Sequence, residues 1–401
     1  MKKSVFVLFA IFLLCSVSCK NDRQDKIELA RNESAKYLYE NYTKKIILEK
    51  ESLLEKKISE MTIEEKVSQL FIINLEGNKF FRAIDVLDGK PYVPGGYLFF
   101  SYNLSETPDE VKAFTDGIKN YCVKNNIIPP FLAVDEEGGY VQRLRKLIGK
   151  IPSQQDVAQT MTVAEAYDLY SAHAEKMREM GFHINLAPVS EVLSDYNKDF
   201  LDNRSFGDAV KTEQYSIAAL NAYQNNGISC VIKHFPGNTN TDPHTGLPEI
   251  KMTSEEMKET LKPFKSVVSH NPRGVLMSHA RTEITDVSLG DSSFSNEPSC
   301  FSSYWVTDVL RGEYGFDGII FSDDIFMGAL ADNGYPPDVA AVKAIEAGVD
   351  CIMISEKRFL KPALVLIEKA KNDENFVKRI DESCRRILKY KAASVIPTEQ
   401  Q

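Results

Sequence analysis

The stretch from Lys233 to Pro248, KHFPGNTNTDPHTGLP, gathers side chains that can donate and accept protons. It holds two of the chain's six histidines and follows the apolar run GISCVI. Asp242 stands two residues before His244, so its carboxylate can bind the imidazole and favour the protonated form. Such a pair is a general acid/base unit. The alternative is that Asp242 caps a turn and His244 is a solvated loop residue.

A second candidate is the pair of acids Asp323 and Asp324, which end the apolar run IIFSDD. A carboxylate at a strand end can be a nucleophile or a metal ligand, or it can cap a following helix. Neighbouring side chains on a strand point to opposite faces, so at most one of the two should face a site. These residues alone leave catalysis and capping as equal alternatives.

Charged residues also follow other apolar runs. Asp135 ends PFLAVD and is followed by a glycine turn and then by Arg143, while Arg204 belongs to the motif DNRSFG. A carboxylate can accept hydrogen bonds from two neighbouring sugar hydroxyls, and arginine can donate to hydroxyls. The simpler alternatives are an Asp135–Arg143 ion pair at the rim and a solvated Arg204.

A metal site formed by Asp242, His244 and His279 is a further alternative. These residues lack the close spacing of a metal-binding motif, and the sequence holds no histidine-rich or cysteine-rich motif. We therefore expect no metal and no cofactor.

The elements that must position these residues repeat along the chain from about residue 60. Apolar, β-rich runs alternate with helix-like segments such as 162–180 and 336–347, which indicates a parallel sheet covered on both faces. The pattern predicts an α/β fold, a single (β/α)8 TIM-type barrel with one strand missed, and no dinucleotide fingerprint supports a Rossmann fold. The seven runs are 95–101, 130–139, 182–189, 227–237, 274–280, 315–324 and 348–355.

The polar candidates share one position within these runs. Barrel enzymes build their active sites at the C-terminal ends of the strands. We therefore expect the candidates to converge on one face of the barrel. The residues at these ends are Asp135, Lys233, His234, His279 and Asp323.

The N-terminus, MKKSVFVLFAIFLLCSVSC, predicts export. Two lysines precede an apolar run that is too short to span a bilayer comfortably, and small residues follow before Cys19. This pattern is typical of a bacterial lipoprotein signal over residues 1–19, with Cys19 as the lipidated residue. An ordinary cleaved signal is the alternative. We expect a membrane-anchored lipoprotein that faces the periplasm or the cell exterior.

Composition sets the remaining limits. A net charge of −9 excludes a nucleic-acid partner, because phosphate binding needs a basic surface. Residues 20–57 are highly charged and predict a helical tether, which leaves residues 58–395 as the catalytic domain. We expect a monomer. The cysteines beyond Cys19 predict no disulfide framework, since they are scattered and odd in number.

Several motifs occur in the order typical of one family. They are MTIEEKVSQLF, GGYLFFSYN, DEEGGYVQR, INLAPV, NRSFG, KHFPG with a following D-x-H, MSHA and GFDGIIFSDDIFMGA. Together they resemble glycoside hydrolase family 3, in its single-domain β-N-acetylglucosaminidase (β-hexosaminidase) branch. The resemblance covers about Met61 to Tyr390. It implies a retaining exo-β-N-acetylhexosaminidase that removes terminal β-linked GlcNAc from glycans or peptidoglycan fragments.

The resemblance also implies a role for each candidate. Asp323 would be the nucleophile that forms a covalent glycosyl-enzyme. His244 would carry the proton, with Asp242 as its partner. The residues implied to hold the terminal sugar are Asp135, Arg143, Arg204, Lys233 and His234.

The sequence departs from the family pattern at three places. The loop between KHFPG and the D-x-H is two residues shorter than usual, Glu136 stands where a Gln is frequent, and Glu191 stands where an Asp is commoner. Two alternative functions stay open. One is a β-N-acetylglucosaminide phosphorylase, since a histidine acid/base would tolerate phosphate as acceptor. The other is a muropeptide-binding lipoprotein without catalysis.

Overall fold

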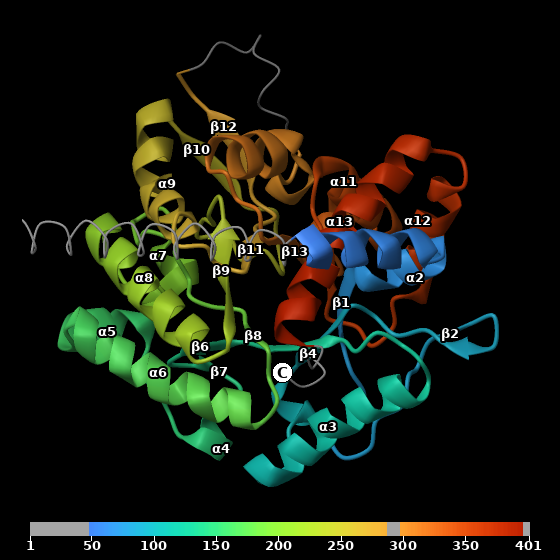
Figure 1. Ribbon diagram of the computed structural model, residues 1–401. Coiled ribbons are helices and arrows are strands. Elements are labelled where there is room, and N and C mark those ends of the chain that lie inside the picture. Colours follow the sequence, from blue (N-terminus) through green and yellow to red (C-terminus); the bar gives the residue numbers. More distant parts are fainter. Residues whose placement is uncertain (1–47, 287–296, 396–401) are drawn as a thin grey trace, which may run out of the picture. The chain divides into compact units, whose positions relative to one another are not determined.

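The computed structural model describes residues 48–286 and 297–395 (Figure 1). The chain forms two compact units, Met1–Glu60 and Met61–Gln401. Within the described part of the first unit, residues 48–60 are helical. None of the helices in the described ranges is long and apolar enough to cross a membrane.

The predicted signal segment, with Cys19, and most of the predicted tether lie outside the described residues. Export, lipidation and the tether therefore stay predictions. The remaining elements all belong to the second unit.

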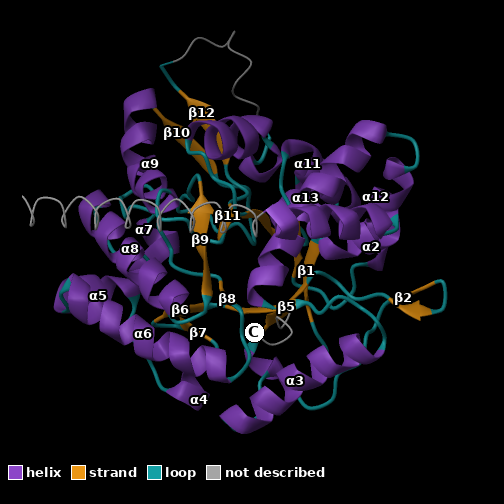
Figure 2. Ribbon diagram, viewed as in Figure 1, coloured by secondary structure: helices purple, strands orange, loops and turns teal. Residues whose placement is uncertain are grey.

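The second unit is a closed barrel of parallel strands surrounded by helices, as predicted (Figures 1 and 2). Every strand pair in the barrel is parallel, and nearly all strand residues are buried, because helices cover the outer face and side chains fill the interior. In spatial order the strands are β1 (Phe71–Asn74), β14 (Cys351–Ile354), β13 (Ile319–Asp324), β11 (Gly274–Met277), β9 (Ser229–Phe235), β8 (Ile184–Asn185), β5 (Phe131–Val134) and β4 (Gly96–Phe99).

The seven predicted runs contain seven of these strands, and the missed strand is β1. Only Leu70 lies between it and helix α2 (Ile63–Gln69), and no Gly or Pro separates the two elements. The apolar sequence LFIIN therefore looks like a continuation of the helix. Pairing with β14 and β4 makes it a strand and closes the barrel.

Helices follow most strands, as the alternating pattern predicts. The longer ones are α2, α3 (Pro108–Lys124), α5 (Gln154–Thr160), α6 (Val163–Glu179), α8 (Ala209–Asn225), α9 (Ser254–Val268), α11 (Pro337–Ala347), α12 (Leu360–Ala370) and α13 (Glu374–Ser394). The shorter ones are α4 (Arg145–Ile148), α7 (Lys198–Leu201), α10 (Gly328–Asp332), η1 (Ser101–Asn103), η2 (Asp202–Arg204) and η3 (Ser299–Phe301). A π-helix, η4, spans Tyr304–Glu313.

Four of these helices begin with the same local signal, a threonine followed three residues later by a glutamate. The threonine side chain accepts from the glutamate's N–H, and the glutamate carboxylate accepts from the threonine's N–H. This capping box satisfies backbone donors that a helix start leaves unpaired, so the sequence fixes these starts locally. The pairs are Thr62/Glu65, Thr107/Glu110, Thr162/Glu165 and Thr253/Glu256.

Three small two-stranded sheets complete the described part of the unit. The pair most relevant to the site is β6 (Glu136–Gly138) with β7 (Val141–Gln142), a hairpin that begins directly after Asp135. β10 (Glu249–Met252) pairs with β12 (Arg281–Ile284) just beyond the loop that carries Asp242 and His244. The third sheet pairs β2 (Val86–Leu87) with β3 (Lys90–Pro91).

Candidate active site

Four of the predicted sugar-binding residues lie in one connected cluster of charges. Nζ of Lys233, in β9, lies 2.8 Å from Oδ1 of Asp135 and 2.7 Å from Oε1 of Glu137. Glu137 accepts two further hydrogen bonds from Arg204, at 2.8 and 2.9 Å. Arg143 lies 3.8 Å from Oδ2 of Asp135. The cluster therefore joins the C-terminal ends of β5 and β9 to η2, in the loop after β8.

Burial and charge act against each other in this cluster. Burial alone would raise the pKa of Glu137, but the charges of Lys233 and Arg204 outweigh it and hold the pKa well below its usual range. Burial likewise opposes the charge of Lys233, and the carboxylates of Asp135 and Glu137 outweigh it and raise the Lys233 pKa. Each ion keeps its charge because its partners compensate for lost hydration. The result is a fixed set of charged donors and acceptors that suits sugar hydroxyls.

His234 takes no part in this cluster. Its Nδ1 lies 2.6 Å from Oε1 of Glu191, and both residues are buried. The same carboxylate accepts from the backbone and side-chain N–H groups of Asn238, at 2.6 and 3.1 Å. Glu191, one of the departures from the family pattern, therefore fixes both the His234 ring and the first residue after KHFPG.

Asp242 and His244 form the predicted pair. Nδ1 of His244 lies 2.7 Å from Oδ1 of Asp242, which also accepts the His244 backbone N–H at 2.9 Å. That backbone N–H is the main reason why the pKa of Asp242 lies below its usual value, and the imidazole adds to the effect. The His244 side chain is 66% exposed, so Nε2 has room to meet a substrate.

Asp323 and Asp324 separate at the end of β13, as their alternation on a strand predicts. The Asp324 carboxylate accepts the backbone N–H groups of Phe326 and Ser355, at 3.1 and 3.0 Å, and burial raises its pKa. Oδ1 of Asp323 accepts the N–H of Asp324 at 2.8 Å. Asp324 therefore ties the strand end to its surroundings, whereas the Asp323 carboxylate accepts one hydrogen bond, through Oδ1, from the described residues.

No hydrogen bond or ion pair within the described ranges joins the dyad to Asp323 or to the charged cluster. The loop reaches the β13 side through its backbone, because a Cβ on Gly328 would lie 3.5 Å from the carbonyl oxygen of His244. The third residue of the metal alternative, His279, contacts Cys300 and Asp324 and neither member of the dyad. In the described part of the chain, no group of three or more His, Cys, Asp and Glu is arranged to hold a metal ion.

Sequence reasoning missed Glu137, the residue that bridges Lys233 and Arg204. Its signal was its place in DEEGG, one residue beyond Glu136 on the same short strand. The two neighbours point to opposite sides of that strand, as is usual. Glu136 turns inward to accept the backbone N–H of Leu144, while Glu137 faces the cluster.

Two aromatic residues lie beside Arg143. The rings of Phe100 and Tyr102 stack with centroids 5.8 Å apart, and Arg143 lies over Phe100 at 5.6 Å. The Tyr102 hydroxyl donates to Oδ1 of the buried Asn74 at 2.7 Å, although the residue is 59% exposed. This strip lies beyond the end of β4 and continues the charged cluster through Arg143.

The sequence of this chain is similar to those of known proteins. The family profile described as "Glycosyl hydrolase family 3 N terminal domain" matches residues 62–390. Beta-hexosaminidase LpqI of Mycobacterium tuberculosis is 28% identical over 314 residues, which are 76% of each chain. A beta-hexosaminidase of Methylococcus capsulatus is 32% identical over 273 residues, 65% of this chain and 75% of that one.

Solved structures show the same similarity. A family 3 β-N-acetylglucosaminidase from Paenibacillus superposes with a TM-score of 0.74 at 26% identity, covering 85% of this chain and 64% of that one. LpqI of M. tuberculosis gives a TM-score of 0.70 at 28% identity and is covered over 94% of its length.

A closed parallel barrel with charged residues at the C-terminal ends of its strands is the architecture of a (β/α)8-barrel enzyme. The chain belongs to glycosyl hydrolase family 3. It is an enzyme of the type that the β-hexosaminidases of this family represent.

Proposed function

We propose that this protein is a retaining exo-β-N-acetylhexosaminidase that removes terminal β-linked GlcNAc from glycans or peptidoglycan fragments. The observation that carries the proposal is that separate groups at the C-terminal ends of the barrel strands suit sugar binding and suit catalysis. A compact charged cluster offers donors and acceptors for one sugar ring, while Asp323 and the exposed His244–Asp242 pair offer a nucleophile and a proton carrier.

In the first step an oxygen of Asp323 attacks the anomeric carbon, and the bond to the leaving oxygen breaks. Nε2–H of His244 gives its proton to that oxygen, while the Asp242 carboxylate stabilises the imidazolium through Nδ1. The depressed pKa of Asp242 keeps this partner charged.

In the second step the neutral His244 takes a proton from water, and the water oxygen attacks the same carbon. The bond to Asp323 then breaks and GlcNAc leaves with its original configuration. Asp135, Arg143, Arg204, Lys233 and His234 are the residues that would hold the sugar through both steps. Buried ion pairs support this assignment for the cluster, because they keep its groups in place before substrate binds.

The predicted export signal and Cys19 support a membrane-anchored lipoprotein that faces the periplasm or the cell exterior, and we propose that it acts as a monomer. Peptidoglycan fragments are the substrates that such a location would supply. Radiolabelled palmitate incorporated into the wild-type protein, and absent from Cys19→Ala, tests the anchor.

The nucleophile is tested with Asp323→Ala. Release of 4-nitrophenol from 4-nitrophenyl β-GlcNAc should fall by about 10⁴-fold or more, because no covalent intermediate can form. Added azide should restore turnover and yield the α-glycosyl azide. Asp317→Ala, near the opposite end of the same strand, is the matched control and should keep full activity. An Asp323→Ala enzyme that is as active as wild type would rule out this nucleophile.

The acid/base role is tested with His244→Ala. The loss of rate should be about 10²-fold or more for a disaccharide and much smaller for the nitrophenyl glycoside, whose leaving group needs little protonation. His270, an exposed histidine elsewhere, supplies the control substitution. Equal losses on both substrates would contradict the role. Assays in phosphate buffer that form GlcNAc-1-phosphate would instead identify a phosphorylase.

A further inference from the structure

A buried histidine contacts the backbone of Asp324, the residue that follows the proposed nucleophile. His279 follows β11, and it is 1% exposed. Its Nε2 lies 3.0 Å from the carbonyl oxygen of Asp324, and its Nδ1 lies 3.2 Å from Sγ of Cys300. The proposed function gives neither His279 nor Cys300 a task.

The chemistry of these contacts fixes one tautomer. A carbonyl oxygen can only accept, so Nε2 must carry the proton. A neutral ring then has an acceptor at Nδ1, which faces the Cys300 thiol. Burial raises the pKa of that thiol well above its usual value, so its proton is available to donate. The contacts form a chain of two hydrogen bonds, which we call the relay. The Cys300 Sγ–H donates to Nδ1 of His279, and Nε2–H of His279 donates to the Asp324 carbonyl.

Cys300 is held in place for this contact. It lies in η3, and the preceding residue, Ser299, donates its backbone N–H and its hydroxyl to the carbonyl of Ala280, at 2.9 and 2.5 Å. Ala280 is the neighbour of His279. The relay therefore joins two segments that are already hydrogen-bonded to each other.

The relay ends on the residue that supports the nucleophile. The N–H of Asp324 donates to Oδ1 of Asp323, and its carbonyl accepts from His279 and from the N–H of Met327, at 3.0 and 3.1 Å. A shift of the Asp324 backbone would therefore move the N–H donor that orients the Asp323 carboxylate. A backbone donor aimed at a carboxylate is a charge-assisted hydrogen bond, which is stronger than a neutral one.

We propose that His279 is a positioning residue for the nucleophile Asp323, acting through the Asp324 carbonyl, and that Cys300 sets the tautomer that His279 needs. This inference rests on the proposed function, in which Asp323 attacks the sugar. It adds two residues to the reaction that touch no substrate and act through backbone geometry.

The first test compares two amides at position 279. In His279→Gln the side-chain NH2 can take the place of Nε2–H and still reach the Asp324 carbonyl, whereas the shorter chain of His279→Asn cannot. We expect His279→Asn to lower kcat about 10-fold with KM almost unchanged, and His279→Gln to recover most of that loss. Equal kcat values for the two variants would overturn the proposal.

The second test uses Cys300. Serine keeps a donor toward Nδ1, so Cys300→Ser should keep kcat within about twofold of wild type, and Cys300→Ala should lower it about fivefold. Cys384→Ala removes another buried thiol, in α13, and controls for lost packing. It should lower the melting temperature without changing kcat. A Cys300→Ala loss no larger than that of Cys384→Ala would overturn the role of the thiol.

A third measurement needs no activity. The ¹⁵N shifts of the His279 ring should show a protonated Nε2 and an unprotonated Nδ1, because Nε2 faces a carbonyl oxygen and Nδ1 faces a thiol. Cys300→Ala should shift the Nδ1 signal. An Nδ1-protonated ring would overturn the relay even in an inactive protein. A relay that is present in a protein unable to cleave β-GlcNAc would contradict the proposed function alone.

Discussion

At the residue scale, Lys391 is a lysine whose charged form is destabilised by burial inside the barrel domain. Its side chain is fully buried, Nζ donates to Oε1 of Gln69 at 2.6 Å, and the ammonium lies over the Phe131 ring. Burial lowers its pKa to about 7. The groups around it are neutral at this pH, since they are the buried thiols of Cys122, Cys351 and Cys384.

This lysine predicts a pH dependence of stability. Above pH 7 the folded protein releases the Lys391 proton while the unfolded chain retains it, so the free energy of unfolding rises with pH. The free energy of unfolding should rise by up to about 1.4 kcal/mol per pH unit. The rise should end near pH 8.5, because cysteines of the unfolded chain then begin to ionise while the buried thiols of the folded protein stay protonated. Urea unfolding of Lys391→Met should lack this slope. Lys378→Met, on the exposed side of the same helix, should keep it; an identical slope in all three proteins would refute the assignment.

One of the residues at which this chain differs from its family pattern is Glu191. Glu191 reaches both His234 and Asn238 with one carboxylate. The longer side chain is therefore compatible with the shorter loop that follows. Local sequence could point out the substitution, but its two partners lie more than forty positions further along the chain.

At the scale of elements, Asn240 holds the middle of the loop that carries the dyad. Asn240 donates its side-chain amide to the carbonyl of Asp195 at 2.9 Å and accepts the N–H of Asp199 at 2.9 Å. Its backbone N–H bonds the carbonyl of Tyr196. Asp242 follows two residues later, so these bonds set the position from which His244 works.

Asn240→Ala should therefore weaken proton transfer more than sugar binding. We expect kcat on a disaccharide to fall about fivefold to tenfold, with a smaller effect on the nitrophenyl glycoside, because the loop samples more positions. The free energy of unfolding should change by no more than about 1 kcal/mol, since the residue is exposed. Asn372→Ala, at an exposed helix end, is the control. A uniform rise in KM without this difference between substrates would show that the bonds serve binding instead.

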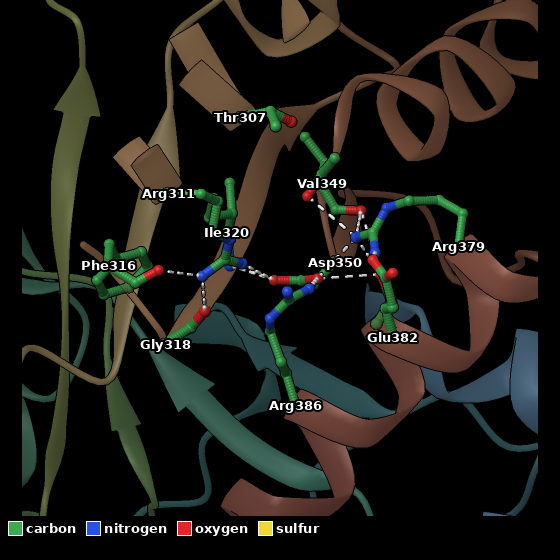
Figure 3. Close-up of polar contacts among 12 residues, drawn as sticks. Thr307, Arg311, Phe316, Gly318, Ile320, Val349, Asp350, Arg379, Glu382 and Arg386 are labelled. Atoms are coloured by element: carbon green, nitrogen blue, oxygen red, sulfur yellow. Dashed lines mark hydrogen bonds and ion pairs between the residues drawn. The ribbon is translucent and has the colours of Figure 1, made fainter. Parts of the chain in front are cut away.

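At the scale of the whole barrel unit, the end opposite the site is closed by one buried acid. Asp350 precedes β14 and is fully buried, and it binds Arg311 of η4 and Arg379 and Arg386 of α13 (Figure 3). It also accepts the backbone N–H of Ile320 in β13. Two strands and two helices therefore meet at a single carboxylate.

Removing that carboxylate should lower the stability of the protein without changing its catalysis. Asp350→Ala leaves three arginines without their shared partner and should lower the free energy of unfolding by about 3–5 kcal/mol. While the variant stays folded, kcat and KM should match wild type, because stability residues of such barrels lie at the N-terminal face. Glu382→Ala removes only an exposed partner of Arg379 and should be nearly neutral. A large loss of kcat in folded Asp350→Ala would contradict this separation.

Much of this fold was readable in the sequence because its signals are local. Apolar runs mark the strands, Thr-x-x-Glu boxes mark helix starts, and the place of Asp135, Lys233 and Asp323 at the ends of runs follows from strand direction alone. The failure at β1 has the same cause. Without a break after α2, only pairing with distant strands distinguishes a strand from a longer helix.

The sequence by itself determined the barrel class, the family and the chemical types at the strand ends, because periodicity and motif spacing act over a few residues. The tertiary structure alone decided the partners. Glu137 meets Arg204 across 67 positions, and His279 meets Asp324 across 45. Such contacts depend on strand register and on the paths of loops, which no local pattern contains. The physical reason is that a side chain's charge and orientation are settled by whatever the folded chain brings within a few ångströms of it.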